Sequence, residues 1–543
     1  MKLICLVLAL QFAFGAAGFA QMKTRRPVGG RKPVGKASTT SELQQLRAAV
    51  KANPSDATAH NALGLALAKE NDLQAAAFEF NEAIRLKSDY AEAHANLGIA
   101  LERQADFTNA LAAFRRAAEL APNDAELHVS IASILTRTQN LEGAIDELKL
   151  AAKLNPNAPA TRSNLGFLLA QKGDLQSSIA EFEAAVKLKP DLAEAHYFIG
   201  TAQSLLRAWP DAVAALRQAI KLKPRWPEAV ASLGKALREV GEYDEAVKVL
   251  REAIQLKPGQ TEAHNNLGLT YLQARRYDEA LAEFRAALKL NNNNDTARLN
   301  IGLTLFQKGD TDGAIAVYQD LLKRDEESVE AHYNLALAYK RKDDLTKALA
   351  STDAALKLEP DFADGHFTRG QILLQQNQLD AAIESLNKAL VRKDNDAEAY
   401  YTLGNAWARK NEAEAAAIAY RNALRYAPND AEIHNALAAA LRKLGQTDEA
   451  SAAQADAERL RKAKQAREIA QTAVATGEQR MNEGKYAEAV ERFEAAIKAD
   501  DSYAMAYARL SAALRKLGKT AEADTAWQKA IALDASLQKT LRP

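Results

Sequence analysis

The chain has few of the residues that catalytic and disulfide-bonded proteins need. It contains one cysteine, Cys5, among 543 residues, and this cysteine lies in the apolar run at the start of the sequence. If that run is removed, no thiol remains, which excludes disulfides, thiolate metal sites and cysteine nucleophiles. The sequence also lacks a phosphate-binding loop, a nucleophile elbow, a zinc-ligand spacing and a dinucleotide fingerprint. We therefore predict that the protein is not an enzyme and uses no metal or cofactor.

The sequence has no large excess of charge of either sign. It carries 71 basic and 70 acidic residues, a net charge of +1, and this balance gives no indication of nucleic-acid binding. Residues 1–40 hold seven basic and no acidic side chains, so the remainder carries 64 against 70, a net charge of −6. The sequence thus predicts a basic leader followed by a mildly acidic body.

The leader has the features of an export signal. Residues 1–20 begin with Lys2, continue as an apolar run and end in small residues, which predicts a secretory signal cleaved after Ala20. The uncharged residues 3–22 are near the lower length limit for a membrane span, so an uncleaved anchor is the alternative. Residues 21–40 are rich in proline, glycine and basic side chains, which predicts a flexible linker. This linker is either a solvated spacer or a tether that touches anionic lipid. We expect a periplasmic or extracellular protein whose membrane association, if any, runs through residues 1–36.

One stretch of 34 residues, Thr261 to Asn294, recurs along most of the chain. With Thr261 as position 1, glycine or alanine returns at position 8 in twelve consecutive units without an insertion or deletion: Gly64, Gly98, Ala132, Gly166, Gly200, Gly234, Gly268, Gly302, Ala336, Gly370, Gly404 and Ala438. Position 20 is alanine or serine in all of them, and position 32 is often proline. A period this strict indicates one supersecondary unit copied many times.

The spacing of these residues resembles the tetratricopeptide repeat, a helix–turn–helix unit. The resemblance implies an all-α fold, a right-handed superhelical α-solenoid of stacked helical hairpins. In a solenoid each unit contacts only its neighbours, so the length of the chain does not require several globular domains. No segment of the sequence has the alternation of a strand.

The register divides the chain into five parts. Residues 1–20 are the signal or anchor, 21–40 the linker, 41–56 an N-terminal capping helix, and 57–464 twelve contiguous repeats. From Ala450 to Thr476 there is no glycine or proline, which predicts one long helix. The interval to the next position 8 is then five residues longer than the repeat. Gly477 and Ser511 occupy position 8 of two further repeats within 465–543.

The turn within each repeat is predicted from positions 15 and 16. They pair a residue that tolerates left-handed backbone with a residue suited to capping, as in Asn71–Asp72, Gly173–Asp174, Gly241–Glu242 and Gly309–Asp310. The small residues at positions 8 and 20 allow the two helices to approach closely, and the larger residue at position 24 fills the space beside them.

Histidines at position 4 and acidic residues at position 2 could in principle bind cations. All eight histidines occupy position 4: His60, His94, His128, His196, His264, His332, His366 and His434. Stacked helices lie about 8–10 Å apart, too far for neighbouring imidazoles to share a zinc ion, so we expect packing between helices instead. Position 2 is acidic in nine of the twelve units. A cation-binding stripe is the alternative there to a simple helix-dipole effect, which suffices to explain these residues.

Position 6 is the strongest candidate for partner binding. It is asparagine in five repeats: Asn96, Asn164, Asn266, Asn300 and Asn334. In the family that the sequence resembles, the first helices line the concave side of the superhelix, so Asn266, Asn300 and Asn334 would form a ladder. Amide side chains both donate and accept hydrogen bonds, as the backbone of an extended peptide requires. The alternative is that asparagine is merely inherited with the duplicated unit.

This ladder is similar to the repeat region of the O-linked N-acetylglucosamine transferases. Their catalytic domain is not recognisable in this sequence, and the lysine and asparagine positions of chaperone-binding repeats do not match either. The resemblance implies a protein-interaction scaffold that binds protein or peptide partners. The alternative is a substrate-recruiting subunit of an envelope-assembly or protein-modifying complex whose catalytic chain is separate.

Overall fold

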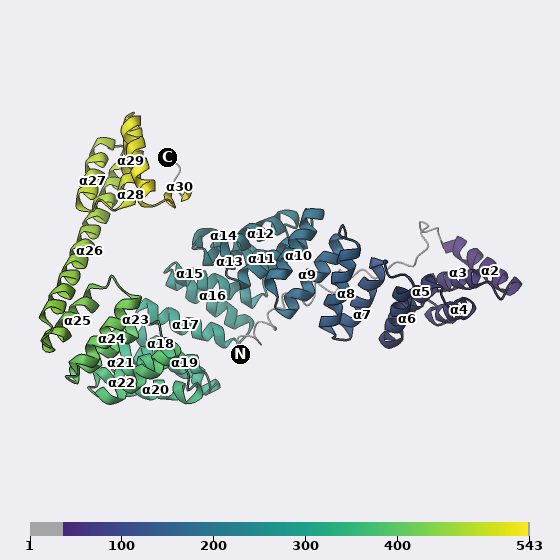
Figure 1. Ribbon diagram of the computed structural model, residues 1–543, viewed down its shortest axis with the longest axis horizontal. Helices are drawn as coiled ribbons and strands as arrows, with labels where there is room; N and C mark the ends of the chain where they lie inside the picture. Colours follow the sequence, from purple (N-terminus) through teal and green to yellow (C-terminus); the bar gives the residue numbers. More distant parts are fainter. Residues whose placement is uncertain (1–35, 541–543) are drawn as a thin grey trace. The chain divides into compact units, whose positions relative to one another are not determined.

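The structure is a computed structural model that describes residues 36–540, and within that range it contains helices and no strands. The predicted signal, residues 1–20, and most of the predicted linker lie outside the described residues. No helix within 36–540 is long and apolar enough to cross a membrane. The all-α fold predicted from the sequence is confirmed (Figure 1).

The twelve predicted repeats each form a hairpin of a first and a second helix. The first helices are α3 (Ala57–Lys69), α5 (Ala91–Arg103), α7 (Ala125–Arg137), α9 (Pro159–Lys172), α11 (Ala193–Leu205), α13 (Pro227–Glu239), α15 (Thr261–Gln273), α17 (Asp295–Lys308), α19 (Val329–Arg341), α21 (Ala363–Gln375), α23 (Ala397–Arg409) and α25 (Ala431–Lys443). The second helices are α4 (Leu73–Leu86), α6 (Phe107–Leu120), α8 (Leu141–Leu154), α10 (Leu175–Leu188), α12 (Trp209–Leu222), α14 (Tyr243–Leu256), α16 (Tyr277–Leu290), α18 (Thr311–Arg324), α20 (Leu345–Leu358), α22 (Leu379–Arg392), α24 (Ala413–Tyr426) and α26 (Thr447–Asn482).

The turn inside each hairpin has the predicted geometry. Asn71 and Gly173 at position 15 have φ values of 67° and 90°, in the left-handed region that ends a helix. The next residue caps the second helix in six of the twelve repeats: Asp72, for example, accepts a hydrogen bond from the backbone N–H of Ala75 at 3.1 Å. The predicted cap at Glu242 is wrong, because its side chain makes no capping hydrogen bond. A glutamate is longer than the residues that cap well, and α14 begins without a side-chain cap.

Small and large side chains interlock between the two helices of a hairpin. A Cβ atom built on Gly268 would lie 2.6 Å from Cε1 of Phe284, closer than real Cβ contacts allow. Ala280 and Ala287 on α16 are completely buried beside that ring. The predicted roles of positions 8, 20 and 24 are therefore confirmed, and the absence of a side chain at position 8 is what admits the aromatic ring.

The N-terminal end of the repeats is covered by α2 (Lys36–Ala52), which begins inside the predicted linker. It starts after the last proline and glycine of that segment, Pro33 and Gly35, so nothing in its sequence interrupts the helix. Leu43, Leu46 and Val50 on α2 pack against the apolar cluster of the first hairpin. This helix shields an apolar face that the solenoid would otherwise expose, as a capping helix is expected to do.

The C-terminal repeats continue from one long helix. The long helix predicted from Ala450 to Thr476 is confirmed and extends further at both ends: α26 runs from Thr447 to Asn482. It serves both as the second helix of the twelfth repeat and as the first helix of the next. α27 (Tyr486–Ala499), α28 (Ala504–Lys516) and α29 (Thr520–Leu533) complete the last two hairpins. The short α30 (Leu537–Thr540) follows, and Leu537 packs with Trp527 to close the end.

The helices form two compact units that divide after Asn300. This boundary follows compactness, whereas the predicted boundary after residue 464 follows the repeat register. The first unit contains α2 to α16 and the second contains α18 to α30, and α17 begins in one and ends in the other.

Glu102 near the end of α5 is an ionisable group in an unfavourable place. Its side chain is buried, and the nearest cation is Arg137, whose Nε lies 3.7 Å from Oε1. Burial raises the pKa of Glu102, and the attraction of Arg137 together with a hydrogen bond from Ser133 offsets only part of this effect. The ionised form therefore opposes folding of this part of the first unit.

We expect Ala280→Leu to destabilise the hairpin of α15 and α16 by about 1–3 kcal/mol, because there is no space for the larger side chain. Ala282→Leu on the exposed side of the same helix is the matched control. Hydrogen exchange of α15 and α16 is the suitable measurement, since a long repeat protein need not unfold in one step. Equal protection in both variants would contradict the close packing at position 20.

We expect Glu102→Gln to stabilise the first unit at pH 7. Since the folded pKa is raised above the unfolded value, the stability contributed by Glu102 is present below the unfolded pKa and is lost as pH rises through the folded pKa. The advantage of the variant should accordingly grow between pH 4 and pH 7, measured as protection of α5 and α7 from hydrogen exchange. A variant that is less protected than the parent at pH 7 would show that the carboxylate is favourable.

Candidate functional site

The candidate surface is the side of each first helix made by positions 2, 5, 9 and 12, which share a face by helical periodicity. Gly268 at position 8 contacts the second helix and borders this face, since positions 5 and 12 lie about one helical turn from it. We call this side the first-helix face. Position 6 lies at its edge, where consecutive first helices meet, as the contacts of Asn96 show.

Asn96 is held between two first helices. Its Nδ2 donates a hydrogen bond to Oδ1 of Asn61 at 3.1 Å, and Asn61 in turn donates to Oη of Tyr90 at 3.3 Å. Asn96 is only 2% exposed, and its Oδ1 is buried without a hydrogen-bond partner. The amide therefore joins α5 to α3.

The other predicted asparagines differ in their exposure. Asn164 and Asn266 are 6% and 9% exposed, and Oδ1 of Asn266 lies 3.5 Å from Nη1 of the buried Arg238. Asn300 and Asn334 are partly exposed. Asn266 and Asn300 belong to the first unit and Asn334 to the second, so the ladder through all three stays a prediction.

Three aromatic side chains occupy position 5 in consecutive repeats of the second unit. They are Tyr333 on α19, Phe367 on α21 and Tyr401 on α23, and each is partly exposed. We call this set the aromatic stripe. These rings are not among the site residues predicted from the sequence, although the 34-residue register alone places all three at position 5.

Polar groups lie beside the aromatic stripe. Nζ of Lys340 at position 12 donates a hydrogen bond to Oε1 of Gln371, whose Nε2 donates to Oε1 of Glu398 at 3.4 Å. Burial lowers the pKa of Lys340, and the carboxylate of Glu398 acts in the opposite direction. At Asn405 the Oδ1 accepts a hydrogen bond from Tyr420 at 2.8 Å, so its Nδ2 is the group left to donate.

In the first unit the aromatic residue at position 5 is closed off. Tyr197, also at position 5, is 5% exposed and Trp226 is 8% exposed. Their ring centroids lie 4.6 Å apart, and Nζ of Lys223 lies 4.4 Å from the centroid of the Trp226 ring. The rings fill space between α11 and α13 and offer little surface to a ligand.

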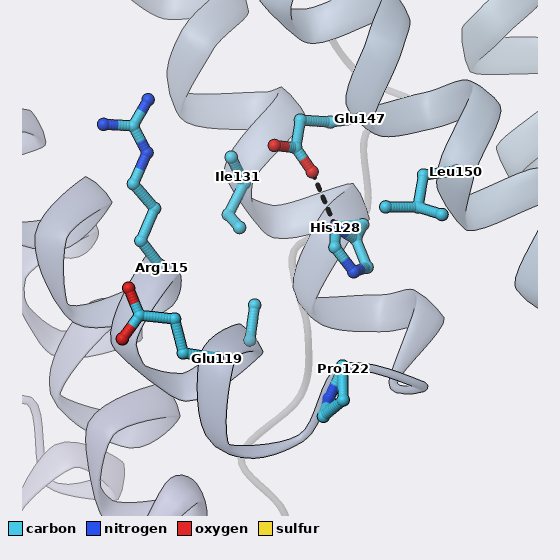
Figure 2. Close-up of a pocket in the computed structure, with 8 residues that line it drawn as sticks. Arg115, Glu119, Pro122, His128, Ile131, Glu147 and Leu150 are labelled. Atoms are coloured by element: carbon cyan, nitrogen blue, oxygen red, sulfur yellow. Dashed lines mark hydrogen bonds and ion pairs between the residues drawn. The ribbon is translucent and has the colours of Figure 1, made fainter.

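The histidines at position 4 lie on the other side of the first helices and have structural contacts. Figure 2 shows His128, whose Nδ1 lies 2.6 Å from Oε2 of Glu147 beside a cavity of about 330 Å³. Two other pairs, His60–Glu79 and His264–Glu283, have distances of 2.6 and 2.7 Å. In six repeats Nε2 lies 2.8–3.2 Å from the main-chain oxygen six residues earlier, in the turn before the first helix: His60, His94, His196, His332, His366 and His434. The imidazoles thus tie the first helix to that turn and, where glutamate is present, to the second helix.

Acids at position 2 have local partners in several repeats. Glu194 and Glu228 lie 3.4 and 3.0 Å from the Nζ atoms of Lys223 and Lys257, each in the same repeat. No group of three histidine, cysteine, aspartate or glutamate side chains within the described residues could hold a metal ion. The acids near a lysine are therefore accounted for by pairing and by the helix dipole.

Comparison with known proteins assigns the repeat. The tetratricopeptide repeat model matches residues 43–91, 95–159, 164–229, 232–295 and 474–536. Further tetratricopeptide models match residues 302–343 and 370–411, 329–362, 397–430 and 419–450. No curated protein matches the chain.

Several solved structures are similar over part of the chain. YrrB, described as a tetratricopeptide protein with an unusual peptide-binding site, is 24% identical over 34% of this chain and 95% of its own, with a TM-score of 0.32. MamA is 28% identical over 32% of this chain and 94% of its own, with a TM-score of 0.30. A tetratricopeptide repeat protein from Parabacteroides merdae is 20% identical over 46% of this chain and 98% of its own, with a TM-score of 0.41.

The predicted similarity to the repeat region of glycosyltransferases is not confirmed by these comparisons and stays a prediction. The assignment of the repeat itself depends on the family model, whose matches cover more than half of the residues. The chain belongs to the tetratricopeptide repeat family.

Proposed function

We propose that the protein is a non-enzymatic scaffold that binds peptide or protein partners on the first-helix face. Repeats of this family fill nearly all of the described chain, so the same positions form an extended face along consecutive first helices. The observation that carries the proposal is the partial exposure of Tyr333, Phe367 and Tyr401 on that face. Partly exposed aromatic side chains are enriched where proteins bind one another.

Within this proposal, two of the asparagines at position 6 form hydrogen bonds with the extended backbone of the partner. Asn300 and Asn334 are partly exposed, and their amides suit the alternating donors and acceptors of a peptide. Asn96, Asn164 and Asn266 are buried, so their contribution is to hold the first helices that carry the surface.

We also propose that the protein is exported, on the basis of the sequence of residues 1–20. The mature chain should begin at Gln21, which N-terminal sequencing of the protein from its native host tests. A chain that retains Lys2 and sediments with membranes would instead identify the segment as an anchor.

A photo-reactive amino acid placed on the first-helix face should cross-link to a partner in the native host. Leu337, partly exposed on α19, is the test position, and Ile418, 53% exposed on the second helix α24, is the control. Cross-links from Ile418 and none from Leu337 would contradict the choice of face.

The variant with Asn266, Asn300 and Asn334 all replaced by alanine should bind the captured partner more weakly, by about tenfold. Hydrogen bonds from Asn300 and Asn334 to the partner's backbone are lost, and so is the contact of Asn266 with Arg238 between two first helices. Asn81→Ala and Asn387→Ala, on exposed positions of second helices, form the control. Unchanged affinity in a titration with the purified partner, at unchanged helicity, would exclude the asparagine ladder.

A further inference from the structure

The aromatic stripe repeats at the interval of the first helices. α19, α21 and α23 contact one another in order, and packed helices lie about 8–10 Å apart. Tyr333, Phe367 and Tyr401 occupy the same position of these helices. A ligand that crosses the three helices therefore meets an aromatic ring at each step of about 8–10 Å.

Neighbouring groups hold these rings in place. Tyr333 packs edge-on against Phe362, with centroids 5.0 Å apart and an interplanar angle of 81°. Its Oη accepts a hydrogen bond from Oγ1 of Thr368 at 3.4 Å. The ring centroids of Tyr401 and Tyr420 lie 5.9 Å apart. Rings that are already ordered lose little conformational entropy when a ligand covers them.

One edge of the stripe is acidic. Glu330 and Glu398 precede Tyr333 and Tyr401 by three residues, so they lie about one helical turn away on the same side. Both are exposed. Glu398 accepts a hydrogen bond from Gln371 at 3.4 Å and attracts Lys340. Asp364, the equivalent residue beside Phe367, is neutralised by Lys393. A ligand with basic side chains at two steps of the stripe would thus meet a carboxylate at each.

We propose that the aromatic stripe binds a polyproline II segment of a partner protein that carries arginine or lysine between its prolines. A polyproline II helix advances about 3.1 Å per residue with three residues per turn, so every third residue recurs after about 9.3 Å, the interval of the rings. Proline at those places presents a flat apolar ring to each aromatic face. The basic side chains between them reach Glu330 and Glu398 and stack on the tyrosines. This inference names the ligand class of the first-helix face and therefore rests on the proposed function.

The test is a titration of the full chain with three synthetic decapeptides. The first, PRAPRAPRAP, has proline at every third residue; the second has the same composition with its prolines adjacent to one another; the third has glutamate in place of each arginine. We expect the first to bind, and the other two to bind at least about tenfold more weakly. Equal binding of the first and second peptides would overturn the proposed spacing, and equal binding of the first and third would overturn the charge match.

Variants assign the binding to the stripe. Replacing Tyr333, Phe367 and Tyr401 with leucine keeps the apolar volume and removes the aromatic faces. The triple variant should bind the first peptide about tenfold more weakly than the parent. Phe78→Leu, which removes a ring 62% exposed on the second helix α4, is the matched control. Glu330→Gln together with Glu398→Gln should weaken binding and reduce its dependence on salt. Circular dichroism confirms that each variant is folded, and unchanged affinity in the folded triple variant would overturn the proposal.

Two further outcomes separate this inference from the proposed function. If no decapeptide binds while a partner still cross-links to Leu337, the polyproline assignment is wrong and the scaffold function stands. A peptide with the sequence of residues 25–36, RRPVGGRKPVGK, also carries proline among basic residues. If this peptide binds about tenfold more tightly than the first decapeptide, the chain's own leader is the ligand and the assignment to a partner is overturned.

Discussion

The close approach of the two helices within each repeat is the constraint on which the rest of the structure depends. Gly98 and Gly404, like Gly268, leave room for a ring of the second helix, and a Cβ on Gly404 would lie 2.4 Å from Cε1 of Tyr420. Because the same small and large positions recur every 34 residues, most hairpins share their internal packing, with Thr352 and Gln454 in place of the large residue in two of them. Each added repeat then contributes its own stability and that of its contact with the neighbouring repeat, so the protein does not depend on a single central core.

Contacts between repeats are more varied and more polar. Nη1 of Arg103 donates a hydrogen bond to the main-chain oxygen of Ala68 at 2.9 Å, and Arg409 does the same to Leu374, in each case 35 residues earlier. These arginines satisfy carbonyl groups at the end of the preceding first helix, which have no partner within that helix. At the N-terminal end of the first helix, histidines at position 4 form hydrogen bonds with the main chain of the turn that precedes the helix. A side chain that looks catalytic in isolation is thus one member of a structural set.

The sequence predicted the features that depend on the repeat itself, and missed those that depend on what neighbouring repeats contribute. The hairpin turn, the packing of Phe284 on Gly268 and the long helix α26 follow from residue types at fixed positions. The burial of Asn96 does not, because it depends on Asn61 in the preceding repeat. The failure of Glu242 to cap its helix shows the same limit at short range, since the length of the side chain decides whether it can reach the first backbone N–H groups.

At Phe367 and Tyr401, two of the three rings of the aromatic stripe, partial exposure goes together with a short residue at the end of the repeat. At Tyr333 the residue in that place is Phe362, which packs edge-on against the tyrosine and still leaves it partly exposed. After Tyr197, position 34 is Trp226, whose ring packs on the tyrosine and closes the surface. After Phe367 and Tyr401, the corresponding residues are aspartates, Asp396 and Asp430. Their carboxylates are turned to the next helix, where Asp396 accepts from the N–H of Ala399 at 3.0 Å and Asp430 from that of Glu432 at 2.8 Å. A short capping residue therefore begins the next first helix and at the same time leaves the preceding ring uncovered, so the choice that stabilises the helix also creates the surface for a partner.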